Sequence, residues 1–153
     1  MLHKLYKQVM EKLTAEAIKQ FAIDWYGFLD VHAPQVDFID NLSKKNVKMV
    51  FPEATLSGRA SFESWYQGVI RIFFDEVHTV KLVESKIAAD GQTANVKVVV
   101  QWEASAWNPP ARFSKRIKCD AYQTWEVAIE DGRIVITVYI VDELKYHKGS
   151  AKL

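Results

Sequence analysis

Residues 78–107 alternate between apolar and polar side chains, and this period of two predicts a long β-hairpin. The first arm places His78, Val80 and Leu82 on one face. The second arm has an apolar residue at every other position, namely Ala94, Val96, Val98, Val100 and Trp102. His78 is therefore a titratable side chain on an otherwise apolar face.

The turn between the two arms decides which faces meet. A two-residue turn at Asp90-Gly91 pairs the apolar face of one arm with the polar face of the other, whereas a three-residue turn, Ala89-Asp90-Gly91, pairs the two apolar faces. Gly91 then takes the left-handed conformation that such turns need. This register sets His78 opposite Trp102, Val80 opposite Val100 and Leu82 opposite Val98. We therefore expect His78 to face the helices.

A second hairpin is predicted over residues 112–141. Its first strand has an apolar face that Lys115 and Gln123 interrupt. This face carries Phe113, Ile117, Cys119, Ala121, Trp125 and Val127. Asp131-Gly132 is a strong signal for a two-residue turn. That turn pairs Ile129 with Ile134, Val127 with Ile136 and Trp125 with Val138. The outward side of the sheet then presents mostly apolar residues, which are Val99, Thr137, Tyr139 and Val141, and predicts a homodimer through the outer sheet face.

Helical periodicity dominates the first half of the chain. It predicts helices over residues 15–30, after Thr14 as a cap, over about 34–42 and over 62–74, besides a short amphipathic helix over 2–12. A short strand over 47–51 ends at Pro52. Helices followed by long antiparallel strands are typical of the α+β class. We therefore predict an α+β fold in which a strongly curved mixed or antiparallel sheet wraps around three N-terminal helices, as a cone-shaped barrel with a pocket.

Length and composition narrow the class of protein. The 153 residues fit a single domain, 1–153, with a core over about 14–142 and a polar tail over 145–153 that we expect to fray. A net charge of +1 argues against nucleic acid and membrane partners. A single cysteine, Cys119, excludes an internal disulfide framework, no motif for a metal is present, and we expect no cofactor. The chain shows no run that resembles a signal peptide or could span a bilayer, which predicts a cytoplasmic location.

His78 and Asp30 are the two candidate catalytic residues. His78 can titrate near neutral pH and act as a general base or acid. Asp30 falls at the C-terminal end of a helix, where the helix dipole disfavours a negative charge, so its carboxylate needs a hydrogen-bond donor. An Asp30 that reaches one ring nitrogen of His78 would make it an oriented base. The alternative is a structural histidine with one hydrogen bond and an Asp30 that faces water.

Other residues on the apolar faces are candidates for binding a ligand. Tyr26 and Gln123 can bind a carbonyl or hydroxyl group, or else be satisfied within the core. The tryptophans Trp25, Trp65, Trp102 and Trp125 line a pocket or pack the core, and in a cone these roles overlap. Cys119 is expected to be a small core residue, and His32, in a turn before Pro34, is expected to be exposed. The predicted ligand is a small apolar molecule.

Four stretches resemble the nuclear transport factor 2-like superfamily, in particular its SnoaL-like branch: WYGFLDVHAPQVDFIDNL, VKMVFPEATLSGRASFESWY, HTVKLVESKIAADGQTANVKVVVQWEA and YQTWEVAIEDGRIVITVYI. The resemblance covers roughly residues 14–142. It lies in the order of elements, the short strand before a Pro and a Gly, and the final Asp-Gly hairpin. It implies a cone whose open end is a pocket. Its members include dehydratases, isomerases, polyketide cyclases and many proteins that are not enzymes.

The resemblance extends to two single positions, and the chain departs from the family at a third. Asp30 is similar in position to a helix-end aspartate of scytalone dehydratase-like members, and His78 to the histidine that opens a long strand and acts with it. Phe51 stands where the steroid isomerase branch has its catalytic aspartate, which argues against steroid isomerase chemistry.

The sequence therefore leads to two functional hypotheses. In the first, a lyase or isomerase moves a proton with His78, orients it with Asp30 and polarises the substrate oxygen with Tyr26 or Gln123. In the second, the chain is a non-catalytic ligand-binding or protein-interaction module that forms a dimer.

Overall fold

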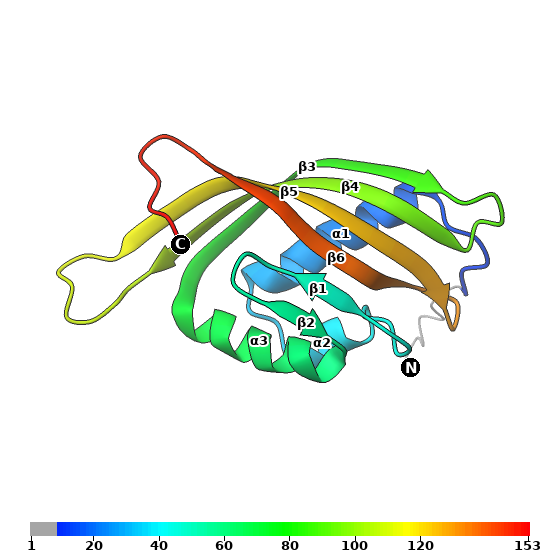
Figure 1. Cartoon of the computed structure of the whole chain (residues 1–153), viewed down its shortest axis with the longest axis horizontal. Helices are drawn as coiled ribbons and strands as arrows, with labels where there is room; N and C mark the ends of the chain where they lie inside the picture. The colour runs from blue at the N-terminus through cyan, green and yellow to red at the C-terminus, as the bar shows by residue number, and fades with distance from the viewer. Residues whose placement is uncertain (1–8) are drawn as a thin grey trace, which may run out of the picture.

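Helix α1 (Ala15–Asp30) lies across the concave face of the sheet in the computed structural model, which describes residues 9–153 (Figure 1). Thr14 caps it as predicted, because its Oγ1 accepts a hydrogen bond from the Ala17 N–H at 3.1 Å. The helix buries one apolar stripe, made of Ile18, Ala22, Trp25, Tyr26 and Leu29. The helix predicted over residues 2–12 falls for the most part outside the described residues.

Two shorter helices follow α1. Helix α2 (Gln35–Ile39) is shorter than the predicted segment, and helix α3 (Arg59–Ile72) begins three residues earlier than predicted. Gly58 precedes α3 with a φ of 82° and permits this earlier start. Trp25 packs edge-on against Phe38 of α2, at 5.1 Å between ring centroids, and these rings form the centre of the core.

Six strands form one sheet in the order β2-β1-β6-β5-β4-β3. The strands are β1 (Lys48–Val50), β2 (Thr55–Ser57), β3 (Phe73–Ile87), β4 (Thr93–Ala106), β5 (Lys115–Glu130) and β6 (Arg133–Tyr146). Strand β1 runs parallel to β6, and the other neighbours are antiparallel. The predicted α+β class with a curved mixed sheet is confirmed (Figure 1). Strand β2 and the start of β3 at residue 73 were not predicted.

The β3–β4 register is correct near His78 and wrong near the turn. His78 pairs with Trp102 and Val80 pairs with Val100, as predicted. Leu82, however, pairs with Val99 instead of Val98, because a register shift between Val80 and Leu82 adds one residue to β3. Leu82 therefore points outward, 37% exposed. The turn is also one residue longer than predicted, with Ala94 opposite Ile87 and the Ala88 N–H bonded to the Thr93 carbonyl.

A second bulge changes the faces of β6. Ile129 pairs with Ile134 and Val127 with Ile136, as predicted, but Trp125 pairs with Tyr139 instead of Val138. The register shift between Glu126 and Val127 makes this difference. Tyr139 and Val141 consequently face inward, and Tyr139 is buried.

The proposed dimer face therefore loses two of its four residues, and this part of the prediction was wrong. Its outward apolar residues are Val99 and, from strands β5 and β6, Tyr122, Val138 and Ile140, all half-buried. The homodimer itself stays a prediction.

The C-terminal tail does not fray, contrary to the prediction. Strand β6 continues to Tyr146, and the segment after it folds back beside β5. The His147 N–H donates to the Lys118 carbonyl at 2.9 Å, and the Ala151 N–H donates to the Arg116 carbonyl at 3.0 Å. These backbone hydrogen bonds attach the tail to the sheet. Within residues 9–153, no helix is long and apolar enough to cross a membrane.

Two glycine substitutions test the backbone geometry around the helices. Gly58→Ala is expected to lower the free energy of unfolding by about 1 kcal/mol, because its φ of 82° strains any residue with a Cβ atom. Gly27→Ala, at an exposed position inside α1, is expected to raise it by about 0.5–1 kcal/mol. A new Cβ meets no atom within 4 Å at either position, so packing does not enter the comparison. Urea unfolding of both variants measures the difference, and equal effects of the same sign would contradict it.

Candidate functional site

A central cavity of about 730 Å³ lies between the helices and the concave face of the sheet. Helix α1 contributes Tyr26 and Leu29 to its wall, and α3 contributes Trp65 and Val69. The sheet contributes apolar positions together with the polar side chains of Glu76, His78 and Gln123. This volume is in the range of small-molecule sites. The expected pocket is therefore present as open space, and tryptophan side chains do not fill it.

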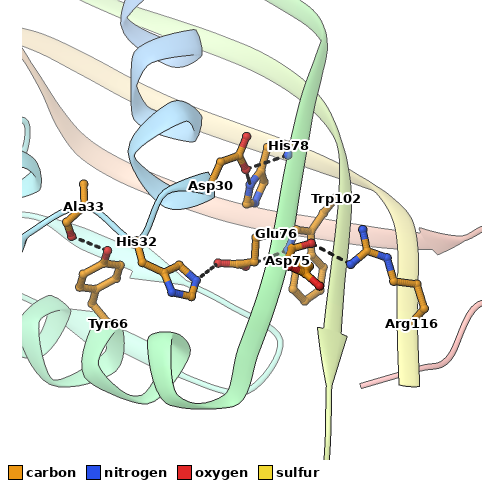
Figure 2. A network of polar contacts seen from close by, with 9 residues as sticks. All are labelled: Asp30, His32, Ala33, Tyr66, Asp75, Glu76, His78, Trp102 and Arg116. Carbon is orange, nitrogen blue, oxygen red and sulfur yellow. Dashed lines mark hydrogen bonds and ion pairs between the residues drawn. The ribbon is translucent and has the colours of Figure 1, made fainter. Parts of the chain in front are cut away.

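His78 and Asp30 are in direct contact at the wall of this cavity (Figure 2). Asp30 Oδ1 lies 2.6 Å from His78 Nδ1 and also accepts the backbone N–H of His78 at 2.9 Å. Asp30 ends helix α1, and the two N–H groups offset the unfavourable position of its charge there. When Asp30 accepts the proton on Nδ1, the free lone pair of the neutral ring lies on Nε2.

Stacking fixes the plane of the His78 ring. The Tyr26 ring lies 5.0 Å away at an interplanar angle of 26°, and the Trp102 ring lies 6.5 Å away at 24°. The His78 side chain is 7% exposed. Because Asp30 holds one edge of a ring that lines the cavity, His78 has the geometry of an oriented base.

Gln123 is held by two donors on the side of its oxygen. Its Oε1 accepts hydrogen bonds from the Tyr26 hydroxyl at 3.0 Å and from Trp125 Nε1 at 2.9 Å. An indole N–H can donate but not accept, so the atom that faces Trp125 must be the oxygen of the amide. Within the described residues, the Gln123 amide nitrogen makes no hydrogen bond, and Gln123 lines the cavity. The N–H₂ group is therefore available to donate to a ligand.

The Tyr26 hydroxyl makes hydrogen bonds to two members of this network. It lies 3.1 Å from the Tyr139 hydroxyl, and since its proton goes to Gln123, it accepts from Tyr139. Burial is the main cause that raises the pKa of Tyr26 well above its ordinary value, so the phenol is neutral. Tyr26 was predicted as a group that could polarise a ligand. The geometry instead places it as a group that orients Gln123 and stacks on His78.

Glu76 is the site residue that the sequence did not suggest. Its carboxylate is 3% exposed and lines the cavity two residues before His78 on strand β3. Glu76 Oε2 lies 2.9 Å from His32 Nε2, and Oε1 accepts a hydrogen bond from Trp102 Nε1 at 3.1 Å (Figure 2). His32 is half-buried and not exposed as expected. A strand predicted to begin at residue 73 would have placed Glu76 on the His78 face.

The backbone is unusual at both ends of the contact between Glu76 and His32. Asp75 has a φ of 50° and His32 a φ of 48°, a region that residues other than glycine seldom occupy. Asp75 lies in a register shift between Phe74 and Val77, and its carbonyl accepts a hydrogen bond from Arg116 Nη1 at 2.7 Å. The extra residue of this bulge turns Phe73 to the cavity, while Glu76 stays on the face of His78.

A second, open depression of about 480 Å³ lies behind the same residues. Asp30, His32, Glu76 and Arg116 line it. Glu76 therefore borders both the central cavity and this outer depression. Among residues 9–153, no three His, Cys, Asp or Glu side chains are placed to share a metal ion.

The four tryptophans divide into two pairs. Trp65 and Trp102 line the cavity, as predicted. Trp65 stacks on Phe51 at 4.0 Å between ring centroids. Trp25 and Trp125 do not line the cavity, which favours the core-packing alternative for these two residues. They lie one layer deeper, where Trp25 packs the core and Trp125 holds Gln123.

Comparison with known proteins gives the fold. No family model matches the sequence, and no curated protein matches it at a significant level. A scytalone dehydratase-like protein from Novosphingobium aromaticivorans is 15% identical, with a TM-score of 0.67, over 90% of this chain and 94% of that one. LinA-type3, a hexachlorocyclohexane dehydrochlorinase from Novosphingobium barchaimii, is 13% identical, with a TM-score of 0.70, over 90% and 92%.

A third solved structure has the same architecture. It is a protein with a cystatin-like fold from Nostoc punctiforme, 11% identical, with a TM-score of 0.68, over 93% of this chain and 99% of that one. At these identities the likeness is one of fold. It confirms the predicted cone-shaped α+β fold, which is called cystatin-like in the Nostoc protein.

The buried phenols predict a loss of stability in alkali. Burial raises the pKa of Tyr139 to about 12 from an ordinary value of 10.0. Unfolded phenols ionise first, so the contribution of Tyr139 is complete below pH 10 and is lost as the pH rises to about 12. The pKa difference corresponds to roughly 3 kcal/mol. Urea unfolding at pH 9 to 12 should show this fall, and Tyr139→Phe should reduce its slope. An identical slope in the variant would contradict the assignment.

Proposed function

We propose that this chain binds a small apolar molecule in the central cavity and catalyses an elimination, a lyase reaction that begins with proton removal by His78. The observation that carries the proposal is the contact between His78 Nδ1 and Asp30 Oδ1 at 2.6 Å, on the wall of a cavity lined mostly by apolar side chains. The pair provides an oriented base on the wall of this cavity.

The proposed step moves one proton from the substrate to His78 and shifts two electron pairs of the substrate. His78 Nε2 takes a proton from carbon, the electron pair of that C–H bond forms the carbon–carbon double bond, and the leaving group departs with the electrons of its own bond. Asp30 stabilises the imidazolium that forms. When the leaving group is hydroxide, the imidazolium returns its proton to it and water is released. When it is a halide, the proton passes to solvent.

Gln123 is the proposed group that polarises the substrate. Its amide N–H₂ can donate to a carbonyl or hydroxyl oxygen, while Tyr26 and Trp125 hold its oxygen in place. This arrangement costs the site no reorganisation when charge develops on the substrate oxygen.

Two of the similar structures favour elimination over isomerisation. One is named for a dehydratase and the other for a dehydrochlorinase, and both names denote the removal of a proton and a leaving group. The likeness supports the reaction class and leaves the substrate open.

Removal of the base tests the proposal directly. Neutral β-hydroxy ketones and halogenated alicyclic compounds are screened for binding by thermal shift, and hits are followed for the ultraviolet absorbance of a conjugated product. His78→Ala is expected to lower kcat by about 10²–10⁴-fold, and Asp30→Asn by at least about 10²-fold, because each removes the oriented base. Thr79→Ala, on the outward face of β3, is the matched control. Unchanged turnover in His78→Ala would reject the catalytic role and leave ligand binding alone.

A second pair of variants separates polarisation from positioning. Gln123→Met removes the donor and is expected to lower kcat by about 10-fold or more. Tyr26→Phe keeps the ring against His78 and removes one of two hydrogen bonds to Gln123, so its effect is expected to be smaller. The two kcat values are compared on the same substrate. A larger loss in Tyr26→Phe than in Gln123→Met would show that the phenol acts on the substrate itself.

A further inference from the structure

The charged side chains that line the central cavity are acidic. Among the described residues, Glu53 and Glu76 line it, and no lysine or arginine does. Asp30 adds a further carboxylate directly behind His78. A ligand in the cavity therefore lies near two carboxylates, and no lysine or arginine of the described lining compensates their charge. An imidazole compensates it only when it is protonated.

Glu76 is the deeper of the two carboxylates. It makes two hydrogen bonds, one with the imidazole of His32 and one from the indole N–H of Trp102. Neither donor cancels the charge while His32 is neutral. A carboxylate has about four acceptor positions, so these two bonds do not exhaust it.

Arg116 is the arginine close to this site, and its hydrogen bonds go to groups other than Glu76. Arg116 lines the outer depression, and its Nη1 donates to the Asp75 carbonyl at 2.7 Å and to Ser105 Oγ at 3.1 Å. Figure 2 shows this guanidinium directed at the backbone of Asp75, on the side of β3 away from His32. Arg116 therefore holds the backbone of the bulge at Asp75, and within the described residues its ion pair is with Glu103 and not with Glu76.

Together with aliphatic side chains, aromatic rings form a large part of the remaining cavity wall. The lining includes six of them, from Tyr26, Phe51, Trp65, Phe73, Trp102 and Tyr139. Phe73 packs edge-on against Trp102, at 5.1 Å between ring centroids, beside Glu76. The faces of such rings attract cations, and they do so more strongly where water is excluded.

We infer that Glu76 determines the substrate class: the cavity takes an apolar compound that carries one cationic nitrogen and rejects carboxylates and phosphates. The nitrogen lies at the Glu76 end, among the rings of Phe73 and Trp102. Residues two apart on a strand are roughly 7 Å apart, so the carbon that faces His78 is a few bonds from this nitrogen. The inference rests on the proposed function in sharing its cavity, and it is tested by binding alone.

Three probes of one shape and different charge test the inference. They are 2-(2-naphthyl)ethylamine, 2-(2-naphthyl)ethanol and 2-naphthylacetate, and their affinities for the full chain are measured by titration calorimetry. The measurement is made at pH 8, above the range in which imidazoles ordinarily take up a proton. The amine is expected to bind at least tenfold more tightly than the alcohol, and the carboxylate at least tenfold more weakly. Equal affinity of amine and alcohol, or no binding of the amine, would overturn the inference.

Variants of Glu76 assign the preference to this residue. Glu76→Gln is expected to bind the amine at least tenfold more weakly while the affinity for the alcohol stays within about twofold, and Glu76→Asp, which keeps the charge, is expected to retain the preference for the amine. Glu84→Gln, on the exposed side of the same strand, is the control for loss of a carboxylate. Thermal unfolding shows whether each variant is folded. A folded Glu76→Gln that still prefers the amine would overturn the assignment.

The same titration in His78→Ala separates this inference from the proposed reaction. A preference for the amine that persists in this variant supports the substrate class without any catalysis. If the preference is present and no compound is turned over, the lyase proposal fails alone. If a neutral compound is turned over with dependence on His78 and the amine is not preferred, the inference on Glu76 fails alone.

Discussion

The site depends on one carboxylate oxygen that accepts two hydrogen bonds from the same residue. Asp30 Oδ1 receives both the backbone N–H and the ring of His78, so it joins the end of α1 to the middle of β3. An aspartate at a helix C-terminus is unfavourable by itself, and these two donors supply the compensation. The helix and the strand are thereby held in one register. The contact that ties the helix to the sheet therefore also orients the His78 ring.

The β-bulges decide which side chains surround this base. Without the shift between Glu126 and Val127, Tyr139 would face outward and the hydroxyl chain to Gln123 would lack its first member. Without the shift between Phe74 and Val77, Phe73 would not lie on the cavity side beside Trp102. A bulge reverses the strand face on which all later side chains lie. A single extra residue therefore changes which side chains line the cavity wall. The curved sheet is thus adapted to the site at a few positions.

These bulges also explain how much could be predicted from the sequence. Alternation of apolar and polar residues predicted the strands, the inward His78 and its partner Trp102, because these depend on a regular period of two. It failed for Leu82 and Tyr139, which lie beyond an extra residue that no sequence pattern marks. The contact of His78 with Asp30 came from the resemblance to a known family. Alternation also does not tell how deep a side chain lies below the cavity wall. Trp125 shares a face with Gln123 but lies behind it.

The two carboxylate–imidazole pairs of the site are built in opposite order. In one, His78 faces the ligand and Asp30 lies behind it, whereas in the other the Glu76 carboxylate lines the cavity and His32 approaches it from the outer depression. The wall therefore offers a basic lone pair and a negative charge a short distance apart. Proton removal leaves negative charge on the substrate, which Glu76 would oppose and Gln123 alone would relieve. A cationic nitrogen on the substrate removes this conflict, because it offsets the charge of Glu76 and makes a nearby C–H bond more acidic. The geometry of the second pair is thus consistent with the chemistry of the first.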